Sequence, residues 1–89
     1  MQKYFVEFLG TFLLSFVIFA TNNYLSIGAA LAIAVLLGGA ISGGAFNPAI
    51  AVCLFLTKKI TKNELLPYIV SELFGAICGL YLAKLFGLL

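Results

Sequence analysis

Charge is scarce in this chain of 89 residues: only 9% of the residues are charged, whereas 64% are hydrophobic. A typical soluble domain is about 25% charged and about 45–50% apolar. Because a small domain leaves much of its surface exposed, it cannot hide this much apolar area from water. The composition excludes a soluble enzyme, a nucleic-acid-binding protein and a disordered tail. It predicts an integral membrane protein whose solvent is lipid.

Several residue types that carry chemistry are also missing. The sequence has no histidine and no arginine, so it offers no histidine catalyst, no imidazole metal ligand and no guanidinium clamp. The net charge of +2 is too small to indicate a polyanionic partner. Cys53 and Cys78 each lie in an apolar run, and we interpret them as small buried hydrophobic side chains rather than a disulfide or a metal site. We therefore expect no metal, no cofactor and no enzymatic activity.

In place of charge, the chain has a stretch of fifty uncharged residues between Glu7 and Lys58. As one helix this stretch would be about 75 Å long, and a hydrocarbon core is about 30 Å thick, so it can hold two spans and half of another. Polar turns and glycine clusters divide it. The sequence therefore predicts one all-α domain over residues 1–89. Its transmembrane helices are expected at about residues 4–21, 25–41 and 65–89, and a re-entrant loop with a half-helix at about residues 42–57.

The start of the half-helix carries the residues on which a function would depend. Asn47 is a favoured N-cap residue, Pro48 is favoured at the first helical position, and Ala49 is small enough for another helix tip to approach. The positive dipole end of this helix would lie near the bilayer midplane, where it repels cations. Backbone carbonyls leading to an asparagine donor are typical of a path for neutral solutes, and a loop that merely fills space is the alternative. The expected pore-lining residues are Asn47, Gly43, Gly44 and Ala45.

The same segment carries a family resemblance. Ser42 to Ile50, with the sequence Ser-Gly-Gly-Ala-Phe-Asn-Pro-Ala-Ile, resembles the SGxxxNPAx signature of the aquaporin and aquaglyceroporin family. Glu7–Thr11 resembles the start of that family's first helix, and Pro67–Ala76 resembles its third. Chains of the family carry two such repeats in tandem, whereas this sequence carries one repeat, of the N-terminal kind. The expected fold is therefore half of an aquaporin.

The resemblance implies a passive channel for water and small uncharged solutes such as glycerol, with Asn47 as the pore asparagine. It implies that Glu7 accepts backbone amides of the re-entrant loop, and an interfacial acid paired with Lys3 is the alternative. Glu72 stands where the family has a glutamine; we interpret it as a helix-packing partner, and a functional acid is the alternative. The residues expected to brace the loop are Pro48, Ala49, Glu7 and Glu72.

The constriction departs from the family's pattern. The arginine of the family's second repeat has no counterpart, because Ile50 stands three positions after Asn47. Ile27 replaces the aromatic residue often found early in the second helix. Such an apolar constriction should be wider and less selective for water than a strict water pore. The four positions expected to form it are Ile27, Val35, Gly44 and Ile50.

A single chain supplies only half of such a pore. Three crossings place the two termini on opposite sides, and the half-helix covers half of the membrane, so an inverted copy is expected to complete the pore. The expected assembly is an antiparallel homodimer in membrane lipid, and the resemblance suggests four pores per complex. The lysines oppose two orientations, because four lie on one expected side and one on the other. These are Lys3, Lys58, Lys59 and Lys62 against Lys84.

Other interpretations therefore stay open. The partner could be a different half-length chain, or the sequence could be a non-conducting truncated fragment. From another class, a small dual-topology antiporter would use Glu7 as its proton-coupled carboxylate. Neither this antiporter nor a holin-like pore former would need the loop before Asn47.

Overall fold

The computed structural model describes all residues from Met1 to Leu89 as four helices without a strand. Three helices are long: α1 (Gln2–Thr21), α2 (Tyr24–Ser42) and α4 (Lys62–Leu85). At about 1.5 Å per residue they extend about 30, 28 and 36 Å, and each is long and apolar enough to cross a membrane. The fourth, α3 (Pro48–Leu56), has nine residues and extends about 14 Å. The expected all-α architecture of three spans and one half-helix is confirmed, and the protein is a multi-pass integral membrane protein.

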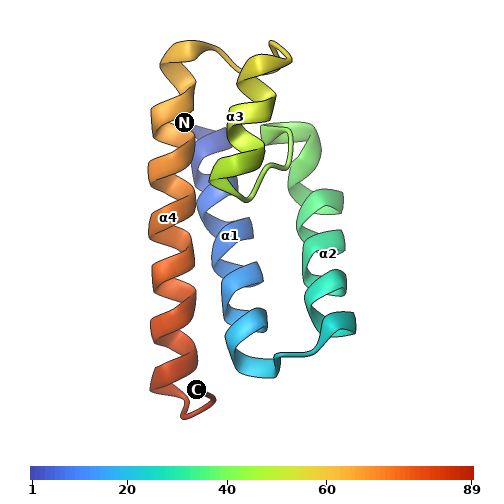
Figure 1. Ribbon diagram of the computed structural model, residues 1–89, viewed down its shortest axis with the longest axis vertical. Coiled ribbons are helices and arrows are strands. Elements are labelled where there is room, and N and C mark those ends of the chain that lie inside the picture. The colour runs from blue at the N-terminus through green and yellow to red at the C-terminus, as the bar shows by residue number, and fades with distance from the viewer.

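The central helix of the bundle is α1. It packs against both α2 and α4, whose main chains do not approach each other, while α3 packs against α4 (Figure 1). Gly75 and Gly79 let α4 approach α1 closely, since a Cβ atom on either glycine would overlap main-chain atoms of α1. Small residues at such positions are how helices approach each other in lipid, where no hydrophobic force drives them together.

The last span differs from its expected position at residues 65–89. Helix α4 begins earlier because Thr61 and Glu64 form a capping box, in which the Thr61 N–H donates to Glu64 Oε1 over 2.8 Å. It ends earlier because Gly87 takes a left-handed conformation with φ +70°. The N–H groups of Gly87 and Leu88 then donate to the carbonyls of Lys84 and Ala83, which closes the helix as a Schellman motif.

The other boundaries differ by one or two residues. Helix α1 begins at Gln2 rather than at residue 4, and α2 begins at Tyr24 because Asn23 Oδ1 caps it by accepting from the Ser26 N–H. Ser42, expected in the re-entrant segment 42–57, is the last residue of α2. The following Gly43 ends this helix with φ +88°, so the re-entrant loop itself is residues 43–47.

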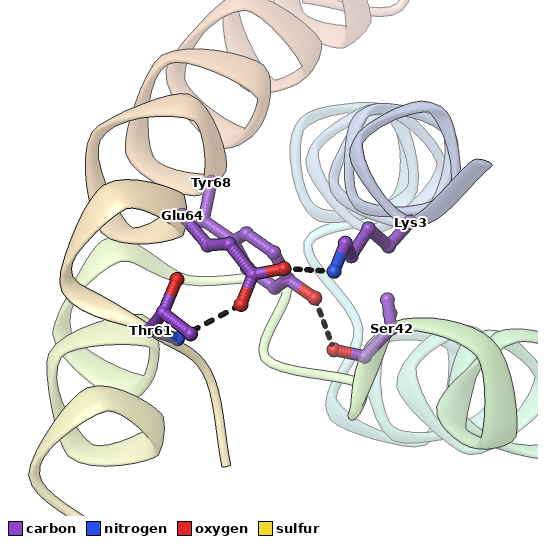
Figure 2. A network of polar contacts seen from close by, with 5 residues as sticks. All are labelled: Lys3, Ser42, Thr61, Glu64 and Tyr68. Carbon is purple, nitrogen blue, oxygen red and sulfur yellow. Dashed lines mark hydrogen bonds and ion pairs between the residues drawn. The ribbon is translucent and has the colours of Figure 1, made fainter. Parts of the chain in front are cut away.

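The N-terminus and the turn between α3 and α4 lie at one end of the bundle, and the C-terminus lies at the other (Figure 1). An ion pair between Lys3 and Glu64 joins the first turns of α1 and α4 at that end (Figure 2). The lysines of the α3–α4 turn and of the start of α4 lie at the same end, whereas Lys84 lies in the last turn of α4.

Candidate functional site

The re-entrant loop reverses the chain within five residues. Gly43, Gly44 and Phe46 all have left-handed backbone conformations, with φ of 88°, 67° and 51°. Glycine adopts this conformation at no steric cost, but a phenylalanine does not. The conformation of Phe46 must therefore be held by its surroundings.

The amide of Phe46 is held by Glu7, which is fully buried on α1. Glu7 Oε1 accepts the Phe46 N–H over 2.8 Å, while Oε2 accepts the Ser42 hydroxyl over 2.6 Å and the Ala45 N–H over 3.3 Å. A carboxylate inside a membrane is costly unless its oxygens are satisfied. Three donors satisfy the Glu7 carboxylate. Lys3, the alternative partner of Glu7, pairs with Glu64 instead.

The ring of Phe46 is held by a slot between α1 and α2. The side chain is only 2% exposed, and a Cβ atom on Gly10 would overlap the ring. On the α2 side, a Cβ atom on Gly38 would lie 3.4 Å from Phe46 Cζ. The missing side chains of the two glycines therefore provide the space that the ring fills.

Tyr68 connects α4 to the end of α2. Its hydroxyl donates to the Ser42 carbonyl over 2.7 Å, and its side chain is 1% exposed (Figure 2). The ring of Tyr4 packs edge-on against it, with ring centroids 5.7 Å apart. Because the Ser42 carbonyl ends α2, this bond fixes the point at which the loop leaves the helix.

The tip of α3 presents Asn47 on an exposed surface. Its side-chain Oδ1 accepts the Ala49 N–H over 2.8 Å, and its carbonyl accepts the Ala51 N–H over 2.9 Å. Pro48 occupies the first helical position, where no N–H is needed. Since the cap engages Oδ1, the side-chain amide presents its Nδ2 donor to whatever lies beside the tip.

The residues expected at the constriction lie at two levels of α2. Val35 and Gly44 are adjacent, because a Cβ atom on Gly44 would lie 3.6 Å from Val35 Cγ2. Ile27 lies eight residues before Val35, which is about 12 Å along the helix. Ile50 is 46% exposed on α3. One chain therefore does not bring these four residues together in a single ring. A closed constriction would need residues from a second repeat.

Glu72 and the cysteines differ in their surroundings. Glu72 is fully buried on α4, and neither of its carboxyl oxygens has a hydrogen-bond partner. Cys53 is exposed, contrary to its interpretation as a buried side chain, because α3 packs mainly against α4 and leaves its opposite face open. Cys78 is half-buried, and neither cysteine forms a disulfide.

Three contributors to the loop were missed by the sequence reasoning. The Ser42 hydroxyl, the Phe46 ring and the Tyr68 hydroxyl were not assigned roles, although all three hold the loop. A signal existed for Tyr68, since a tyrosine inside an apolar span needs a hydrogen-bond partner. Nothing in the local sequence identifies that partner, which lies 26 residues away along the chain.

Comparison with known proteins gives consistent matches. Residues 22–87 match the family model described as Major intrinsic protein. The chain is 37% identical to "Glycerol uptake facilitator protein-like 6" of Lactiplantibacillus plantarum, over 97% of this chain and 44% of that protein. It is 35% identical to "Aquaglyceroporin AqpS" of Rhizobium meliloti, over 71% of this chain and 27% of that protein.

A plant relative matches over a shorter segment. "Probable aquaporin PIP2-1" of Oryza sativa subsp. japonica is 48% identical over 52% of this chain and 16% of its own length. The chain thus spans less than half the length of these relatives. No solved structure gives a significant match. With a family model covering most of its length and a relative that aligns over nearly all of it, the chain belongs to the major intrinsic protein family of membrane channels.

Proposed function

We propose that this chain forms half of a passive pore for water and small uncharged solutes such as glycerol. The observation that carries the proposal is Asn47, exposed at the tip of a membrane half-helix whose loop is anchored by the buried Glu7. Two relatives are named as a glycerol uptake facilitator and an aquaglyceroporin, which supports this class of solute.

The site acts by exchanging hydrogen bonds, without a chemical step. The main-chain carbonyls of Gly43 and Gly44 supply acceptors, and Asn47 Nδ2 supplies a donor because its Oδ1 is engaged in the cap. A solute hydroxyl group or a water molecule can donate to these carbonyls and accept from Asn47 Nδ2. Ala45, also expected to line the pore, is only 5% exposed and packs in the core instead. An ion finds no replacement for its hydration shell at an apolar constriction, and the positive end of α3 disfavours cations. We expect protons and sodium ions to be excluded.

The pore is completed by a second, inverted repeat, which we propose is another copy of this chain. Helix α3 covers only about 14 Å of a core about 30 Å thick, so two half-helices must meet near the midplane. The two termini lie at opposite ends of the bundle, as in the repeats of proteins that are built from two inverted units. The pair would place two Asn47 side chains at the midplane. Each constriction would combine residues from the Ile27 level and the Val35 level of α2. Four such pores per complex are part of this proposal.

The geometry supports a channel over an antiporter that uses Glu7 as its proton-binding acid. Both oxygens of Glu7 are engaged by donors, and the side chain is fully buried. A transported proton would have to displace the bonds that hold the loop in place. A carboxylate in this position anchors the loop rather than exchanging with solvent.

Stopped-flow light scattering of proteoliposomes tests the proposal. We expect water and glycerol permeabilities above those of protein-free vesicles, equal in swelling and shrinking, and independent of a proton gradient. Proton and sodium fluxes should stay at the level of protein-free vesicles. Permeabilities equal to those of empty vesicles would overturn the proposal, and dependence on a proton gradient would favour the antiporter.

A further inference from the structure

Glu72 on α4 is a buried acid without a hydrogen-bond partner. It projects from α4 with no exposed surface, and its two oxygens are the only buried side-chain polar atoms without a hydrogen-bond partner. An ionised carboxylate left in this way in an apolar interior carries a large desolvation cost. Its position beside the loop therefore needs an explanation.

Glu72 lies one turn of α4 from Tyr68, which bonds to the Ser42 carbonyl, and one turn from Gly75, which packs against the main chain of Phe8. This register places its carboxyl beside the Glu7 carboxyl of α1 and the main-chain amide of Asn47, although no hydrogen bond joins Glu72 to either group in the structure. The other titratable groups gathered around this pair are the phenols of Tyr68 on α4 and Tyr4 on α1. The loop, α2 and α3 add no titratable group to the cluster. No cation compensates two carboxylates here, since Lys3 pairs with Glu64.

The hydrogen-bond partners of Glu7 decide which acid carries a proton. Glu7 accepts from three donors, which is the environment of an ionised carboxylate. Two adjacent carboxylates in a site without a cation cannot both be ionised. A protonated carboxyl group offers one donor and one acceptor. The two groups that face Glu72 are one acceptor and one donor, so the protonated form matches both.

We propose that Glu72 is a positioning residue that acts in its protonated form, donating to the Glu7 carboxylate and accepting from the Asn47 main-chain amide. One side chain of α4 thereby orients both the anchor of the loop and the N-cap residue of the half-helix. The consequence for solute flux rests on the proposed function, but the protonation and the order of the loop do not.

Infrared spectroscopy of the purified protein at neutral pH tests the protonation. The chain has only three acidic side chains, so a band can be assigned by substitution. We expect the carbonyl-stretching band of a buried protonated carboxyl in the wild type and its loss in Glu72→Gln. The control Glu64→Gln, which can keep the capping box, should retain the band. A wild type without the band, or a band that persists in Glu72→Gln, would overturn the proposal.

Hydrogen exchange of the Phe46 amide and solute flux test the positioning role. Glu72→Gln keeps one donor and one acceptor and should leave both readouts near the wild-type values. Glu72→Met has a similar length and neither function, so exchange of the amide should accelerate about tenfold or more. Wild-type exchange in Glu72→Met, or failure of Glu72→Gln to preserve slow exchange, would overturn the role. If the wild type itself conducts nothing, the proposed function fails, while the band and the exchange rates still decide the role of Glu72.

Discussion

The loop before α3 is an irregular backbone at membrane depth, where no water is available to satisfy polar groups. Such backbone is tolerated only when protein supplies its hydrogen bonds. Here the bonds form a connected set: the Tyr68 hydroxyl donates to the Ser42 carbonyl, the Ser42 hydroxyl donates to Glu7, and Glu7 accepts the Phe46 amide. Each member is buried, so each loss leaves a polar group without an alternative partner.

Removing the carboxylate of Glu7 should therefore destabilise the protein strongly. Glu7→Leu leaves the Ser42 hydroxyl and the Ala45 and Phe46 amides without their acceptor. Each buried donor left unpaired costs about 1–3 kcal/mol, so we expect a loss of several kcal/mol in the free energy of unfolding. Denaturant unfolding in detergent, followed by circular dichroism, measures the loss. Glu64→Gln is the control, and equal stability of the two variants would contradict the role of Glu7 as an anchor.

This set also shows where reasoning from sequence ends. The role of Glu7 was expected from the resemblance, because a motif carries it. The bond from Tyr68 to Ser42 joins positions 26 residues apart, and Phe46 fills a space left by Gly10 on another helix. Such pairings depend on the packing of three helices, which no local pattern specifies. For the same reason, the exposure of Cys53 was misjudged.

At the scale of elements, the punctuation of the sequence accounts for most of the helices. The apolar runs predict three spans, and the short distance from Pro48 to the lysines predicts a half-helix. The boundaries of α4 were missed although their signals are present in the sequence. Thr61 and Glu64 have the spacing of a capping box, and Gly87 supplies the left-handed closing residue. Both signals were overlooked because the apolar run from residue 65 onward determined the expected bounds.

The contact between α1 and α4 gives a prediction with a matched control. Gly75→Ala would place a Cβ atom against the carbonyl of Phe8, and main-chain atoms of a neighbouring helix cannot move aside. We expect a destabilisation of about 1–3 kcal/mol. Gly28→Ala, also in a long helix, meets nothing within 4 Å and should be neutral or stabilising by up to about 1 kcal/mol. Unfolding in detergent compares the two variants, and equal effects would show that helix propensity rather than close packing decides.

The start of α3 gives a prediction that joins stability to flux. Asn47→Ala removes the Oδ1 acceptor of the Ala49 N–H and should cost about 0.5–2 kcal/mol. It also removes the Nδ2 donor, so water and glycerol permeability should fall. Asn47→Asp keeps a cap but places an acid at the positive end of the half-helix, so assembly should survive while permeation changes. Normal conduction by a normally assembled Asn47→Ala would show that this side chain is not the donor of the pore.

At the scale of the whole molecule, the distribution of charge conflicts with the inverted pair that the half-helix requires. Four lysines lie at the end of the bundle that holds the N-terminus, and Lys84 lies at the other end, over the ring of Tyr81. Positive charge favours the cytoplasmic side, so the bias favours one orientation. An antiparallel pair of identical chains instead needs both orientations. The proposed homodimer therefore requires that this bias is too weak to orient every copy.

Labelling from each side of the membrane resolves the conflict. After replacement of Cys53 and Cys78, a reporter cysteine at Tyr24 is suitable, because this residue is 79% exposed and the capping Asn23 stays intact. Membrane-impermeant maleimide should label the reporter from both sides if copies insert both ways. A reporter labelled from one side only, in a preparation of this chain alone that still conducts, would eliminate the antiparallel homodimer.

Changing the lysines should shift the ratio of the two orientations. Lys58→Asn with Lys59→Ala lowers the bias from four-to-one to two-to-one, and asparagine suits the left-handed φ of 65° at position 58. The matched control, Lys58→Arg with Lys59→Arg, keeps the charge and should leave the ratio unchanged. In an antiparallel pore, conduction is limited by the scarcer orientation, so flux should peak where labelling from the two sides is equal. If the labelling ratio changes and the flux does not, each orientation conducts without an inverted partner. The half-helix would then have to meet its complement in a parallel neighbour.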